Sequence, residues 1–147
     1  MNAWLKSTFR QAAWAPITVF VFYAVAAKAL NAYILYPWLD MPTHFFGGIA
    51  ITYFYLVGIC HSQALIGRIP TLIQLALSVG LTAITAVTWE FLEYISDSTL
   101  GTKMSLGVSD TVSDLFFGLL GGVVFAALSA RSAHKVARTT GGIANEA

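Results

Sequence analysis

Charged residues are scarce in this sequence, and that scarcity limits the class of protein it can encode. Only 10% of the 147 residues are Asp, Glu, Lys or Arg, and 57% are hydrophobic, whereas soluble domains average about 25% charged residues. Together with long apolar runs, this composition predicts an integral membrane protein of one domain. The net charge of +1, without a basic stripe, argues against a nucleic-acid partner. Cys60 is the only cysteine, which excludes an internal disulfide and a cysteine-based metal site.

The apolar runs predict four transmembrane helices and therefore an all-α fold, an integral membrane four-helix bundle. Each run has roughly 20 residues or more, enough to cross a bilayer, and the expected spans are about 12–36, 42–60, 71–95 and 111–130. They form a single membrane domain, residues 1–135, and small polar residues predict a disordered tail over 136–147. A signal peptide cleaved near Ala27-Lys28-Ala29 is a competing interpretation, but the apolar run continues beyond that site.

The distribution of basic residues predicts the orientation in the membrane. With four spans both termini lie on one side, and the other side carries only Lys103, while Lys28 falls inside the first span. The side with more Lys and Arg faces the cytoplasm, so we expect a multi-pass plasma (inner) membrane protein with cytoplasmic N- and C-termini. The basic residues on that side are Lys6, Arg10, Arg68, Arg131, Lys135 and Arg138.

Acidic residues gather at the opposite, extracytoplasmic end. Because consecutive spans alternate in direction, the start of the second span, the end of the third and the start of the fourth all reach the same face. In each segment the spacing of i, i+3, i+4 or i+7 places the residues on one side of a helix. Ionisable residues near membrane spans usually serve a function, so we expect one shared site. Its members are Asp40, His44, Glu90, Glu93, Asp97, Asp110 and Asp114.

Six carboxylates at one site cannot all stay ionised without nearby positive charge, because like charges raise one another's pKa. The candidates for that charge are a divalent metal, Lys28, Lys103 and protonated His44. Oxygen ligands favour Mg²⁺, Ca²⁺ or Mn²⁺, and one histidine among carboxylates also permits Zn²⁺ or iron. The sequence therefore predicts a divalent metal and leaves its identity open.

Some of these acids also have a plain structural interpretation. Asp40 and Asp110 stand where helix N-caps belong, and Asp114 in a first turn suits the helix dipole. Capping does not explain Glu90 and Glu93, which approach a helix C-terminus, where negative charge is unfavourable.

Glycines and a tryptophan near the site suggest packing. Gly47-Gly48 lets a neighbouring backbone approach closely, and Gly118-x-x-x-Gly122 is typical of a helix-packing seam. Trp89 is most simply a lipid-facing or packing residue.

Three motifs occur in order: Asp40-Met-Pro-Thr-His44-Phe, Trp89-Glu90-Phe-Leu-Glu93 and Ser109-Asp110-Thr-Val-Ser-Asp114-Leu. They resemble the YjdF-type family of small inner-membrane proteins and, more distantly, VanZ-like proteins. The resemblance covers about residues 35–125. By analogy it implies a relation to membrane enzymes that hydrolyse or exchange lipid head groups, including phosphatidylserine synthases.

The resemblance also implies roles for the site residues. His44 would act as base or nucleophile, and Glu90 and Glu93 as acid, base or ligands. Asp97, Asp110 and Asp114 would be metal ligands, and we expect Asp40 to join them.

Three functions remain open at this point. The leading hypothesis is an enzyme that acts on a phosphate-bearing membrane lipid at the outer leaflet, with His44 moving a proton or attacking phosphorus. A cation- or proton-handling membrane protein would use the same acidic funnel, although spans two to four have few polar residues in their cytoplasmic half. A non-catalytic lipid-binding or assembly factor would depend on the glycine seams instead.

Overall fold

The structure is a computed structural model that describes the backbone of residues 2–26 and 30–144 and the side chains of residues 3–26 and 30–132. Within these ranges all regular secondary structure is helical, in agreement with the predicted all-α class. Lys28, one of the candidate positive charges, lies outside the described residues.

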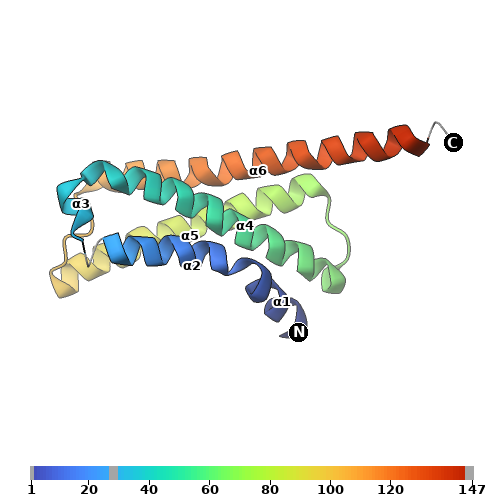
Figure 1. Ribbon diagram of the computed structural model, residues 1–147. Coiled ribbons are helices and arrows are strands. Elements are labelled where there is room, and N and C mark those ends of the chain that lie inside the picture. Colours follow the sequence, from blue (N-terminus) through green and yellow to red (C-terminus); the bar gives the residue numbers. More distant parts are fainter. Residues whose placement is uncertain (1, 27–29, 145–147) are drawn as a thin grey trace.

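Three long helices form the centre of the described fold: α4 (Asp40–Ile66), α5 (Thr71–Leu100) and α6 (Val108–Ala144). Each includes a stretch long and apolar enough to cross a membrane, and each packs against the other two. Since short loops join them, α5 runs antiparallel to α4 and α6 (Figure 1). The start of α4, the end of α5 and the start of α6 therefore lie at one end of the bundle, as the sequence predicts.

The first expected span, 12–36, is divided into shorter pieces instead of forming one helix. Helix α1 (Asn2–Ala12) ends where α2 (Trp14–Ala24) begins, and Figure 1 shows the two at an angle. Pro16 explains this break, because a proline in a helix lacks the N–H that would bond the carbonyl four residues earlier, here that of Ala12. A short helix α3 (Ala32–Leu35) and a 3₁₀ turn η2 (Pro37–Leu39) follow.

The residue just before α3 interrupts the helical backbone a second time. Asn31 has φ 48°, a left-handed conformation in which a right-handed helix cannot continue. Asparagine tolerates this conformation better than most residues. The sequence prediction rested on the length of the apolar run 12–36 and so missed the break.

Helices α1 and α2 run together along α4. At one end the hydroxyl of Thr8 lies 3.1 Å from Nδ1 of His61, near the end of α4. At the other end the ring of Tyr23 packs against that of Tyr33, and Tyr33 contacts Thr43 near the start of α4. The kinked pair therefore follows most of the length of α4.

A glycine seam joins α4 to α6. A side chain on Gly48 would overlap the carbonyl of Gly118, and one on Gly121 would overlap the carbonyl of Phe45. Only glycine permits such close contact between the two backbones. The seam predicted from the glycine spacing is confirmed.

The end of α6 extends into the predicted tail. Its helical backbone includes residues 136–144, although side chains after residue 132 lie outside the described part. The boundary of the membrane domain near residue 135 stays a prediction.

Candidate functional site

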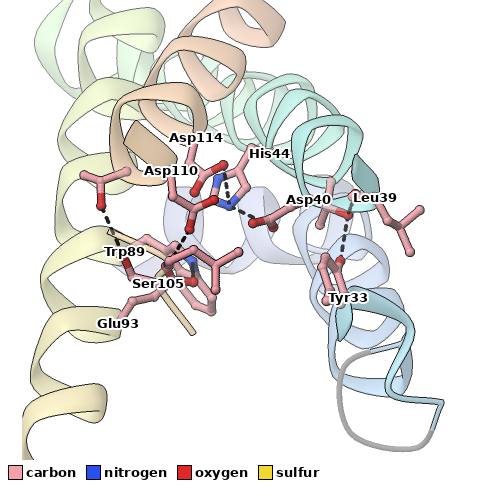
Figure 2. A network of polar contacts seen from close by, with 12 residues as sticks. Tyr33, Leu39, Asp40, His44, Trp89, Glu93, Ser105, Asp110 and Asp114 are labelled. Atoms are coloured by element: carbon pink, nitrogen blue, oxygen red, sulfur yellow. Dashed lines mark hydrogen bonds and ion pairs between the residues drawn. The ribbon is translucent and has the colours of Figure 1, made fainter. Parts of the chain in front are cut away.

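The polar cluster is centred on His44, near the start of α4. Its Nε2 lies 3.4 Å from Oδ1 of Asp40, one turn earlier on the same helix, and 3.8 Å from Oδ1 of Asp114 on α6 (Figure 2). The i, i+4 spacing of Asp40 and His44 makes the first contact possible, and the close packing of α4 on α6 makes the second. His44 is thus held between two carboxylates from different helices.

Three carboxylates of the cluster are buried. Glu93 is 4% exposed, Glu90 8% and Asp114 only 1%. Oε2 of Glu90 and Oδ2 of Asp114 have no hydrogen-bond partner. A buried carboxylate oxygen without a partner is costly, so both atoms require an explanation.

The cluster contains two groups of three side chains whose potential ligand atoms lie within 4.8 Å of one another. One consists of Asp40, His44 and Asp114, and the other of Glu90, Glu93 and Asp114. Either group could hold a metal ion by its geometry. Asp114 belongs to both and connects them.

Asp97, expected as a metal ligand, instead orders the loop between α5 and α6. Its Oδ1 accepts hydrogen bonds from the hydroxyl of Thr102 and, at 2.9 Å, from the amide of Met104, while Oδ2 accepts one at 3.0 Å from the amide of Ser105. Asp97 belongs to neither group of ligand atoms. The structure therefore does not place Asp97 with either ligand group. Its carboxylate accepts hydrogen bonds from the loop instead, and helix spacing in the sequence could not show these donors.

Asp110 also departs from the expected ligand role. Its Oδ2 accepts a hydrogen bond of 2.8 Å from the amide of Leu106, just before α6, and it belongs to neither ligand group. Asp110 is the third residue of α6, so it is not the N-cap that the capping alternative expected, and it satisfies a loop amide just before the helix instead. Asp40 does not cap its helix either. It is the first residue of α4, where Leu39 is the N-cap, and its carboxylate faces His44.

Trp89 contributes to the site in a way that the sequence prediction missed. Its indole Nε1 donates a hydrogen bond of 2.8 Å to Oε1 of Glu93 (Figure 2), and its ring packs edge-on against Tyr23 of α2. The i, i+4 spacing of Trp89 and Glu93 was the available signal. Trp89 therefore positions a carboxylate.

A tyrosine stands at the edge of the site, just outside the long helices. The hydroxyl of Tyr33 lies 2.7 Å from Oγ1 of Thr43, one residue before His44. The hydroxyl of Thr43 donates its proton to the carbonyl of Leu39 at 2.8 Å, so Tyr33 is the donor in the contact with Thr43. This contact fixes α3 to the start of α4.

An apolar cavity of about 140 Å³ lies beside the cluster, between α2, α4 and α5. Val19 and Phe20 of α2, Ile51 of α4 and Ala86 of α5 are among its lining residues, and His44 forms part of the same wall. His44 therefore borders both a group of acids and an apolar space.

The positive charge expected from lysine is not found at the site in the described part of the chain. Lys103 is exposed and makes no ion pair with a described acidic residue. The remaining candidates among the described groups are His44 and a bound cation.

Comparison with known proteins places the chain in a family. It is 30% identical over 100 residues to an uncharacterized protein of Thermotoga maritima. The aligned stretch covers 67% of this chain and 51% of that protein. The chain thus spans about half the length of the curated relative it matches. No solved structure matches it. The family described as "Predicted membrane protein (DUF2238)", of which YjdF is a member, matches residues 1–135, and the chain belongs to that family.

Proposed function

We propose that this protein is a four-span membrane enzyme that hydrolyses or exchanges the head group of a phosphate-bearing lipid at the extracytoplasmic face. The observation that carries the proposal is the position of His44, which contacts buried carboxylates and also lines an apolar cavity. A lipid has this same division between a polar head group and a hydrocarbon chain. The cavity would receive the chain, and the cluster would face the phosphate.

The protein crosses the membrane four times only if α1 and α2 together form one transmembrane span. Helix α2 alone has 11 residues, or roughly 17 Å, and the hydrocarbon core is about 30 Å thick. The contacts of Thr8 and Tyr23 near opposite ends of α4 support a kinked crossing by the pair. Both termini then lie on the side rich in Lys and Arg, the cytoplasm.

His44 is the proposed base. In hydrolysis it takes a proton from water, the water oxygen bonds to phosphorus, and the bond from phosphorus to the head-group oxygen breaks. The proton then passes from His44 to the departing alcohol, so that a phosphomonoester lipid and a free alcohol result. In exchange, a second alcohol replaces water. Asp40 orients the imidazole and stabilises its charged form.

A lipid phosphate is itself anionic and would be repelled by buried carboxylates. A divalent cation bound by these carboxylates would offset that repulsion and stabilise the charge that develops on phosphorus oxygens. The proposal therefore includes a dependence on divalent cations.

Cation or proton permeation is less well supported by the interior below the site. Thr52, Ser78 and Thr82 are buried there, but the hydroxyls of Ser78 and Thr82 are bonded to backbone carbonyls, and Oγ1 of Thr52 lies 2.7 Å from Oγ1 of Thr82. These groups satisfy one another and do not form an evident polar route onward. Ion flux into proteoliposomes without lipid turnover would favour this second function.

A direct test uses the purified protein in detergent with Mg²⁺, Mn²⁺, Ca²⁺ or Zn²⁺ and a panel of phospholipids and polyprenyl phosphates. We expect release of a head group or phosphate from at least one lipid and its loss in His44→Ala. His61→Ala is the matched control, because His61 lies at the opposite end of α4, beside Thr8. If no lipid reacts with any of these ions, the enzyme hypothesis fails. If His44→Ala retains turnover as His61→Ala does, His44 is not the base.

A further inference from the structure

We propose that Glu90, Glu93 and Asp114 form the binding site of one divalent cation of the Mg²⁺, Mn²⁺ or Ca²⁺ type. His44 and Asp40 would stand beside the ion without binding it. This assignment rests on the proposed function for its purpose, but its geometry is independent of the substrate. It differs from the ligand set expected from sequence, which included Asp40, Asp97 and Asp110.

The strongest support comes from the two carboxylate oxygens that lack partners. Oε2 of Glu90 and Oδ2 of Asp114 are both buried without a hydrogen bond, and both residues belong to the same group of three. Each side chain is more than nine-tenths buried. A cation placed among these three residues gives both oxygens a partner.

The spacing of the group suits a single ion. All three residues offer an oxygen within 4.8 Å of the others. Oxygen ligands lie about 2.0–2.1 Å from Mg²⁺ and about 2.3–2.6 Å from Ca²⁺, so opposite ligands of one ion are separated by roughly 4–5 Å. Three carboxylate oxygens without nitrogen or sulfur favour these hard cations over zinc.

Charge leads to the same assignment. Three carboxylates from two helices meet in a buried place, and in the described part of the chain no lysine or arginine forms an ion pair with them. Buried like charges are unfavourable unless a counter-charge accompanies them. A divalent cation supplies that charge and leaves coordination positions for water or a phosphate oxygen.

The neighbouring group is better suited to proton transfer. Asp40 and His44 are more exposed, with side-chain values of 22% and 14%, and their oxygen and nitrogen already face each other. Neither leaves a buried atom without a partner in the described part of the chain. Asp114 then connects the two functions, with Oδ1 toward His44 and Oδ2 without a hydrogen bond.

The test measures Mn²⁺ binding to the purified protein by metal analysis and isothermal titration. Wild type should bind one ion per chain, and affinity should fall by roughly tenfold or more in Glu90→Gln and Asp114→Asn. The matched controls are Asp97→Asn and Asp110→Asn, which remove the same charge from nearby residues and should bind as wild type does. His44→Ala should keep the ion and lose turnover.

Thermal unfolding separates loss of the site from misfolding. Without metal, Glu90→Gln should be at least as stable as wild type, because it removes an uncompensated buried charge. Mn²⁺ added at a concentration near the wild-type Kd should raise the melting temperature of wild type and of Asp97→Asn by more than that of Glu90→Gln. Equal Mn²⁺ affinity in wild type and Glu90→Gln would overturn the assignment, as would two ions per chain with one lost in His44→Ala.

Failure of this site and failure of the proposed function give different results. Lipid turnover in EDTA by a protein that binds no Mn²⁺ would remove the cation site and the proposed cation dependence, and would leave a metal-independent lipid enzyme. Binding of one Mn²⁺ with the expected variant pattern, but no turnover of any lipid, would keep the site and remove the lipid enzyme.

Discussion

Gly48 of α4 lies against the backbone carbonyl of Gly118 on α6, with no room for a side chain between them. Each glycine follows a site residue by one helical turn: His44 precedes Gly48 by four positions, and Asp114 precedes Gly118 by four. One turn further, Thr52 lies beside Gly122. Since α4 and α6 run in the same direction, this register brings His44 opposite Asp114, at 3.8 Å.

Gly48→Ala should therefore damage both the fold and the site. The added methyl group overlaps backbone, which cannot rotate away, so the helices must separate. We expect a loss of about 1–3 kcal/mol in the free energy of unfolding, as for other overpacked interiors, and weaker Mn²⁺ binding because Asp114 moves with α6. Thermal unfolding in detergent and titration with Mn²⁺ would measure the two effects.

Gly80→Ala is the control for this variant. Gly80 lies in α5, and a side chain there meets nothing within 4 Å. Alanine is a better helix former than glycine by about 1 kcal/mol, so stability should stay equal or rise. Equal behaviour of Gly48→Ala and Gly80→Ala would show that the seam does not set the spacing of α4 and α6.

The convergence of the site could be predicted from sequence because it follows from two simple periodicities. Helical spacing places Asp40 with His44, and alternation of the long helices brings the end of α5 to the starts of α4 and α6. The glycine seam was predictable for a similar reason, since Gly118 and Gly122 fall on one helix face. These inferences need only the direction of each helix. The lengths of the apolar runs show which segments cross the membrane, and consecutive crossings alternate in direction.

The parts that sequence did not predict depend on local backbone geometry. Pro16 and Asn31 interrupt the first apolar run, although its composition alone suggests a continuous span. Helical spacing in the sequence places Asp97 and Asp110 with the site residues. In the structure, backbone amides of the loop between α5 and α6 donate hydrogen bonds to their carboxylates. A spacing argument places a side chain on a face and does not show which donors a neighbouring loop supplies.

Trp89→Phe should weaken the site without destroying it. The variant removes the indole N–H that donates to Glu93 and keeps an aromatic ring for packing. Partners that orient a metal ligand typically contribute about 10–100-fold in affinity, so we expect Mn²⁺ to bind roughly tenfold more weakly. Phe91→Leu is the control, because Phe91 is 63% exposed on the same helix. An unchanged affinity in Trp89→Phe would mean that Glu93 is positioned without this bond.

Asp97→Asn should loosen the loop between α5 and α6 and spare the cation. The carboxylate of Asp97 accepts the amides of Met104 and Ser105, and an asparagine can accept at only one side-chain oxygen. We expect faster hydrogen exchange at these two amides, measured by mass spectrometry. Exchange in α4 should be unchanged, which serves as the internal control. Slow exchange in the variant would mean that other contacts order the loop.

Cysteine labelling in intact cells would determine whether α1 and α2 together cross the membrane. The background is Cys60→Ser, since Cys60 is the only cysteine and is exposed. With four crossings, Lys103→Cys reacts with an impermeant maleimide from outside, whereas Ala3→Cys and Arg68→Cys react only after permeabilisation. With three crossings, the N-terminus shares the side of Lys103, because α4 would then be the first span. Reaction of both Ala3→Cys and Lys103→Cys from outside would therefore contradict a fourth crossing. Reaction of Arg68→Cys, but not of Lys103→Cys, from outside would reverse the orientation.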